Sequence, residues 1–157
     1  MASTGDNPGV IAPPPLLFLG ALAAGAALDF WLLRASTGLP GWFRWGLGAV
    51  LAVAMVGLLA AAFGRFRRAG TNVEPWRPST ALVTEGVYRF TRNPIYLAMA
   101  LGYLGVALVA DSVVALILLP PTLALLQVGV IAREERYLAG KFGDDYRRYM
   151  ASVRRWL

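Results

Sequence analysis

The chain has 157 residues, of which 57% are hydrophobic and only 15% are charged, and its formal net charge is +6. This composition is too apolar for an ordinary soluble domain and indicates a small polytopic membrane protein, whose basic residues face anionic lipid rather than nucleic acid. Cysteine and histidine are absent, which excludes disulfides, thiolate zinc sites, cysteine nucleophiles and the commonest general base, and no metal site is expected.

The N-terminal half holds two apolar runs, each long enough to cross about 30 Å of hydrocarbon as a helix. The first covers residues 16–33, because Pro13-Pro14-Pro15 should block an earlier helix start. Asp29 lies near the end of this run, where its carboxylate is expected to snorkel to the interface. The second run covers residues 45–63 and contains no charge.

The C-terminal half holds two further apolar runs, at residues 94–110 and 112–132, after a loop rich in Gly and Pro at residues 70–79. Only Asp111 separates these two runs, so they should form a tight helical hairpin. The sequence therefore predicts an all-α polytopic membrane protein with four transmembrane helices. It forms a single domain over residues 1–157 that ends in a cytoplasmic helical tail.

The basic residues predict the orientation of the four spans. Of the fifteen Lys and Arg, only Arg34 and Arg44 fall outside the long loop and the tail. Cytoplasmic loops carry an excess of Lys and Arg, so both termini and the long loop should lie in the cytoplasm, below a bacterial inner membrane. No Lys or Arg precedes Leu16, so we expect no signal peptide.

A basic and aromatic segment precedes the third span. Asn93 and Pro94 should begin that helix, because Asn favours the N-cap and Pro the first turn. The free N–H groups of the helix, beside Arg92, are suited to a carboxylate or phosphate, and the faces of Tyr88 and Tyr96 to a cation. The alternative is a capped span whose Arg and Tyr side chains anchor it at the lipid interface.

Two adjacent acids, Glu134 and Glu135, lie where the fourth helix should end, although carboxylates are disfavoured near the negative pole of a helix. If the helix continues, neither acid has a basic residue three or four positions away, so pairing within the helix cannot explain them. Their partner should be either Arg89 or Arg92 of the earlier segment, or a cationic or hydroxyl-bearing cofactor.

The tail contains a possible helix break and two tyrosines. Gly143 is suited to end a helix, and Tyr146 and Tyr149 would share one face of the next one. The tail is then either a lid or membrane-lying segment, or a simple anchor.

In these residues the chain resembles the isoprenylcysteine carboxyl methyltransferase and phospholipid methyltransferase family of integral membrane methyltransferases. The resemblance runs from Gly86 to about Arg155. Its segments are Gly86-Val87-Tyr88-Arg89, Arg92-Asn93-Pro94-Ile95-Tyr96, Glu134-Glu135-Arg136-Tyr137-Leu138 and the tail from Phe142 to Tyr149. It implies S-adenosylmethionine as cofactor, used at the cytoplasmic membrane face to methylate a lipid-like or amphipathic acceptor.

Carried over by position, the resemblance also implies the residues of the cofactor site. These are Tyr88, Arg92, Asn93, Pro94, Tyr96, Leu97, Glu134 and Glu135. The helix N-terminus would receive the methionyl carboxylate, the acids its ammonium group and the aromatic faces its sulfonium. Two departures matter: the family often has His where this chain has Asn93, and Pro where it has Val87. The first removes a candidate base, which is tolerable if the family residue acts through its backbone.

The expected reaction is in-line methyl transfer to a carboxylate or amine. A carboxylate needs no base, whereas an amine would need one from Glu134, Glu135 or a tyrosine. The candidate catalytic residues are Glu135, Arg89 and Arg147, with the arginines steering an anionic head group. Two alternatives stay open: a membrane reductase relative that uses NADPH, and a non-enzymatic membrane subunit with a vestigial site.

Overall fold

The computed structural model describes residues 7–74 and 76–157, and within them the regular structure is helical with no strand, which confirms the all-α prediction. The elements in chain order are α1 (Pro14–Leu28), the π-helical turn η1 (Asp29–Leu33), α2 (Gly41–Ala69), the 3-10 turn η2 (Gly86–Arg89), α3 (Pro94–Val109), α4 (Val113–Leu126), the π-helical turn η3 (Gln127–Ile131) and α5 (Ala132–Ser152). The predicted domain also included residues 1–6 and Pro75, which lie outside the described residues.

The predicted apolar runs and the helices differ most at their ends. α1 begins at Pro14, before the predicted Leu16, because the first N–H groups of a helix have no intrahelical partner and proline loses nothing there. α2 extends past its apolar run, residues 45–63, at both ends. Hydropathy marks the apolar part of a helix, whereas hydrogen bonding sets its length. α3 agrees with the predicted run to within one residue.

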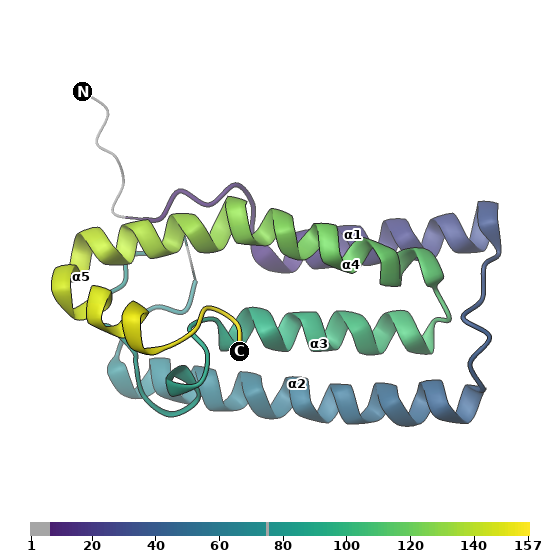
Figure 1. Ribbon diagram of the computed structural model, residues 1–157, viewed down its shortest axis with the longest axis horizontal. Coiled ribbons are helices and arrows are strands. Elements are labelled where there is room, and N and C mark those ends of the chain that lie inside the picture. Colours follow the sequence, from purple (N-terminus) through teal and green to yellow (C-terminus); the bar gives the residue numbers. More distant parts are fainter. Residues whose placement is uncertain (1–6, 75) are drawn as a thin grey trace.

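The sequence predicts that the fourth helix ends near Glu134, but the structure shows that it continues. α4, η3 and α5 form one helix of 40 residues from Val113 to Ser152, and its last part is polar. Gly143 interrupts this helix with φ 55° and ψ −126°, at the break predicted for it, and Figure 1 shows α5 bending there back towards the bundle. Glu134 and Glu135 therefore lie on a continuing helix, without local basic partners.

Three helical segments are long and apolar enough to cross a membrane by length and composition: Pro14–Leu33, Gly41–Ala69 and Val113–Ser152. α3 is also apolar but has only 16 residues, about 24 Å at the rise of an α-helix. These lengths are those of an integral membrane protein. α3 lies between α2 on one side and the pair α1 and α4 on the other (Figure 1).

Small residues let the helices approach closely. A Cβ added to Gly25 of α1 would lie 2.6 Å from the Ala115 Cα of α4, so these two backbones are almost in contact. A Cβ on Gly48 of α2 would lie 3.4 Å from the carbonyl oxygen of Gly105 in α3. Small residues at helix interfaces are the usual means of tight packing in membranes, where helices gain no hydrophobic free energy by leaving water.

The end of the bundle that carries the α3–α4 hairpin is held by Asp111, whose φ of 57° makes the tight turn possible. Its carboxylate accepts from the Thr37 N–H at 3.0 Å, the Thr37 hydroxyl at 2.5 Å and the Ser36 hydroxyl at 2.7 Å, and Arg44 lies 3.3 Å away. These hydrogen bonds, from Thr37 first and then Ser36, lower the pKa of Asp111 to about 2. The predicted hairpin is thus confirmed.

Asp29 does not snorkel, contrary to the sequence expectation. Its side chain is buried, and one oxygen accepts from the Ser112 hydroxyl and from the Val114 N–H at 2.9 Å. The first N–H groups of α4 need an acceptor, and Asp29 supplies one from a distant helix. Asp29 therefore ties η1, at the end of the first helical segment, to the start of α4.

The other end of the bundle gathers four segments far apart in the sequence. The stretch before α1, the connection between α2 and α3, α5 and the residues after it all lie at this end (Figure 1). The prediction that these segments share one side is confirmed as an arrangement in space.

Candidate functional site

A cavity of about 250 Å³ lies at this second end, where α3 begins. Its walls come from the first turn of α1, the end of α2, the connection between α2 and α3, the start of α3, and α5. Seven of the eight predicted cofactor residues line it: Tyr88, Arg92, Asn93, Pro94, Tyr96, Glu134 and Glu135. Leu97 does not line it, and neither do two of the candidate catalytic residues, Arg89 and Arg147.

The start of α3 forms one wall. Asn93 occupies the N-cap position and Pro94 the first turn, as predicted, but the Asn93 side chain does not cap the helix. Its Nδ2 donates to the Arg155 carbonyl at 2.9 Å. The N–H groups of Ile95 and Tyr96 belong to the first turn, so they have no carbonyl of their own helix to bond. Both residues line the cavity, which places a positive dipole end beside it.

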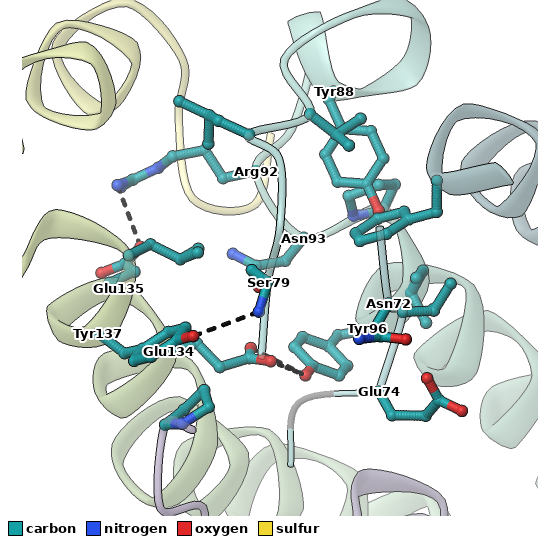
Figure 2. Close-up of a pocket in the computed structure, with 18 of the residues that line it drawn as sticks. Asn72, Glu74, Ser79, Tyr88, Arg92, Asn93, Tyr96, Glu134, Glu135 and Tyr137 are labelled. Atoms are coloured by element: carbon teal, nitrogen blue, oxygen red, sulfur yellow. Dashed lines mark hydrogen bonds and ion pairs between the residues drawn. The ribbon is translucent and has the colours of Figure 1, made fainter. Parts of the chain in front are cut away.

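Glu135, on the facing wall, binds two arginines. Its carboxylate lies 3.0 Å from the Arg92 guanidinium, and Arg155 donates to it with Nε at 3.0 Å and with its second nitrogen (Figure 2 shows the Arg92 pair). The Arg92 and Glu135 side chains are each only 11% exposed. The predicted bridge to Arg92 is confirmed, whereas Arg155 was not foreseen. One carboxylate between two guanidinium groups leaves this part of the wall with a net positive charge.

Glu134 has a different environment. Its carboxylate accepts from the Tyr96 hydroxyl at 2.8 and 2.9 Å (Figure 2), and no Lys or Arg among the described residues forms an ion pair with it. A carboxylate with a single neutral donor inside a cavity can still bind a cation or another hydrogen-bond donor. The two adjacent acids therefore differ: Glu135 is neutralised by the protein, and Glu134 is not.

Aromatic side chains complete the cavity. Tyr88 is buried and packs edge-on against Phe66, with ring centroids 5.7 Å apart. The Tyr149 hydroxyl donates to the Tyr88 carbonyl at 2.7 Å, and Tyr146 packs beside Tyr149, so the predicted shared face of these two tyrosines is confirmed. Burial, helped by nearby Tyr149 and Glu134, raises the pKa of Tyr88, so its hydroxyl stays protonated and is no base.

The connection between α2 and α3 covers the cavity, a role that sequence reasoning missed. Asn72, Glu74, Trp76 and Ser79 line it, and the Ser79 N–H donates to the Tyr137 hydroxyl at 3.2 Å (Figure 2). Gly and Pro content identified this segment only as a loop. The one signal for a further role was a tryptophan within a polar stretch.

An apolar groove of about 620 Å³ adjoins the cavity. It runs between α1 and α2 over α3, and it is lined by Leu, Ala, Gly, Val and Met residues and by three aromatic residues, Phe18, Trp45 and Tyr103. Pro15 and Met99 line both the groove and the cavity, so the two spaces meet there. A polar cavity and an apolar groove thus share a boundary.

A family model described as phospholipid methyltransferase matches residues 43–145. The nickel-cobalt-cadmium resistance protein NccN of Alcaligenes xylosoxydans xylosoxydans is 32% identical over 149 residues, which are 90% of this chain and 69% of NccN. The cobalt-zinc-cadmium resistance protein CzcN of Cupriavidus metallidurans is 33% identical over 64% of this chain and 45% of its own length. The protein-S-isoprenylcysteine O-methyltransferase of Schizosaccharomyces pombe is 33% identical over 46% of this chain and 30% of its own length.

Proposed function

The chain belongs to the phospholipid methyltransferase family, and from this premise we propose that it transfers a methyl group from S-adenosylmethionine to a lipid-like acceptor. The family match and the isoprenylcysteine methyltransferase relative indicate membrane methyltransferase activity. The cofactor and the acceptor are our inference. The observation that carries it is the unequal charge of the cavity, which has an uncompensated acid, Glu134, close to a wall of net positive charge.

The donor set of the cavity fits a ligand that carries both an anionic and a cationic group. Arg92 and the N–H groups of Ile95 and Tyr96 would hold the methionyl carboxylate, and Glu134 would hold the ammonium group. The faces of the lining tyrosines would lie against the sulfonium. S-adenosylmethionine, when bound, supplies an electrophilic methyl group on its positively charged sulfur. The protein contributes orientation and exclusion of water.

In this proposal Glu135 positions rather than reacts, because two arginines already occupy its carboxylate. Arg89 is exposed and Arg147 is bound to Asp144 on the surface, so both would act only on the anionic surface of the membrane. Tyr88 stays protonated, and the chain has no histidine. Glu74 also lines the cavity but pairs with Arg77 at 3.9 Å. Glu134 is the lining acid that forms no ion pair among the described residues and could act as a base, so we favour a carboxylate acceptor, which needs no base, over an amine.

The acceptor would place its hydrocarbon part in the apolar groove and its polar end in the cavity, where Pro15 and Met99 line both. The groove extends along α3 from Met99 to Val109, about 15 Å at the helical rise. This is half the thickness of the hydrocarbon core of a bilayer, about 30 Å. A hydrocarbon chain that reaches from the interface to the middle of the bilayer would fit it.

The proposed topology follows from the same arrangement. All four helical segments would cross the membrane as a single domain, with α3 as the short span. The cavity end would face the cytoplasm of a bacterial cell, because thirteen of the fifteen Lys and Arg lie in the segments that gather there.

The acceptor can be identified by incubating the purified protein with methyl-labelled cofactor and a total lipid extract, and then finding which lipid gains label. Ala52→Leu would narrow the groove and should slow transfer to the long-chain acceptor without changing cofactor affinity. Ala54→Leu, two residues along and outside the groove, is the matched control. Label in no lipid fraction, from a protein that binds the cofactor, would contradict a lipid acceptor.

The names of NccN and CzcN refer to resistance to metal ions. Among residues 7–74 and 76–157, no group of three His, Cys, Asp or Glu lies together as a metal site would require. We therefore do not propose a metal site among these residues.

A further inference from the structure

The residues that follow α5 return to the cavity. Val153 has an extended backbone, with φ −125° and ψ 133°, and ends the helix. The Arg154 carbonyl then accepts from the Arg92 N–H at 3.0 Å. The Arg155 carbonyl accepts from the Thr91 hydroxyl at 3.1 Å and from Asn93 Nδ2 at 2.9 Å. This short segment thus lies along residues 91–93, the wall where α3 begins.

The Arg155 side chain binds the opposite wall of the cavity. Arg155 donates to both oxygens of Glu135 on α5, with the fork geometry that arginine presents to a carboxylate. Trp156 Nε1 donates to Gln127 Oε1 at 3.0 Å, which attaches the segment to the π-helical turn η3. π-helical turns often occur at functional sites. Arg155 is therefore bonded to both walls of the cavity, by its carbonyl on one side and its guanidinium on the other.

Two consequences follow for the residues that line the cavity. The Asn93 amide is engaged by a main-chain carbonyl, so it holds the start of α3 in place rather than facing a ligand. Glu135 is fixed between Arg92 and Arg155, so the Arg92 guanidinium has one preferred position. Both effects set the distance between the anion-binding start of α3 and the acid Glu134 on α5.

We propose that Arg155 is a positioning residue that couples the two walls of the cavity, so that the segment after α5 belongs to the cofactor site. This inference rests on the proposed function for its ligand, but the coupling itself is a property of the protein alone. Any side chain that donates an N–H at position 93 would preserve the contact with the Arg155 carbonyl, and one that only accepts would break it.

The test compares Arg155→Ala and Arg155→Lys with Arg154→Ala, whose side chain is exposed. Amide hydrogen exchange in the full-length protein should rise in Arg155→Ala at residues 91–96 and also at residues 131–138. Arg154→Ala should exchange like the wild type. Affinity for S-adenosylmethionine should fall about tenfold to a hundredfold in Arg155→Ala, the effect of losing a charged hydrogen-bond pair, and less in Arg155→Lys.

Position 93 supplies the second pair of variants. Asn93→His keeps an N–H donor and should retain most of the cofactor affinity, whereas Asn93→Asp places a carboxylate against the Arg155 carbonyl and should lose it. Unchanged exchange in either wall of Arg155→Ala, or a uniform rise throughout the protein, would overturn the coupling. If the wild type binds no S-adenosylmethionine, the proposed function fails, and the exchange measurement still decides whether Arg155 couples the walls.

Discussion

The two ends of the helix bundle both carry buried or half-buried acids, but the acids at the two ends differ in their hydrogen-bond and ion-pair partners. At the hairpin end, Asp111 accepts three hydrogen bonds from Ser36 and Thr37 and pairs with Arg44. At the cavity end, Glu134 accepts hydrogen bonds from the Tyr96 hydroxyl and from no other side chain of residues 7–74 and 76–157. The first acid has its partners supplied by the protein, and the second has an open cavity in front of it.

This difference separates a structural acid from one that is suited to a ligand. Burying a carboxylate costs free energy that local donors must offset. Asp111 meets this requirement with a loop that folds over it, and so closes the α3–α4 turn. Glu134 lacks enough local donors to offset the cost of its burial. A bound cation would therefore stabilise the folded protein at this position. Glu135 lies next to Glu134 in sequence yet belongs with Asp111, because two arginines neutralise it.

The largest effect on stability should come from Glu135→Ala, which leaves Arg92 and Arg155 together without an acid. Breaking a buried ion pair in this way should lower the free energy of unfolding by about 3 kcal/mol, the lower end of the usual range, because the Arg155 side chain is 36% exposed. Thermal unfolding in detergent measures it. A melting temperature equal to that of the wild type would show that Glu135 is no structural acid.

Glu134→Gln should do the opposite, with little change in thermal stability and a large change in binding. Losing the charge that faces the ammonium group should weaken binding of S-adenosylmethionine about tenfold to a hundredfold. Equilibrium titration of the variant beside the wild type checks this, with Asp111→Asn as the control acid from the other end. Equal affinities of Glu134→Gln and wild type would remove the distinction between the two ends.

Asp111→Asn should lower the melting temperature at neutral pH and leave cofactor affinity within about twofold, as expected for a distant site. The pKa of Asp111 falls from an ordinary 3.8 to about 2 in the folded protein, so its contribution is present above pH 4. That contribution is lost as the pH falls through about 2. A melting curve against pH should show this loss in the wild type and not in Asp111→Asn.

The smallest effects should come from Arg147→Ala and Arg89→Ala. Arg147 is 65% exposed and forms a surface pair with Asp144, and Arg89 is exposed, so each should change the rate of methyl transfer by no more than about twofold. Assays with the acceptor in uncharged detergent remove any effect of a charged membrane surface. A tenfold loss in either variant would return that arginine to the catalytic residues.

The sequence predicts the features of this fold that depend on the backbone preferences of one or two neighbouring residues. The start of α3 at Asn93 and Pro94, the hairpin at Asp111 and the break at Gly143 each follow from one or two residues with strong backbone preferences. The absence of basic neighbours around Glu134 and Glu135 predicted partners from another segment or from a ligand, and the structure gives both acids partners from other segments. The sequence therefore predicts both of the segments that line the cavity, although their role as a cofactor site stays a prediction.

The predictions from the sequence fail where a residue binds or packs against a segment that is distant in the sequence. Asp29 bonds to the start of α4, 85 residues later, and spacing within its own helix gives no sign of this. Arg155 binds Glu135 only because α5 bends at Gly143 and brings the chain back. The helix through Glu134 continues beyond the apolar run that ends at residue 132. It does so because Ala132–Ser152 packs its own apolar face against the cavity end of the bundle. Hydropathy cannot report such packing.

The central claim is that the cavity at the start of α3 binds S-adenosylmethionine, and equilibrium titration of the purified, folded wild-type protein tests it most directly. We expect saturable binding that S-adenosylhomocysteine displaces and that NADPH does not affect. Saturable binding of NADPH would identify a reductase instead. Failure to bind S-adenosylmethionine at millimolar concentration would contradict the account.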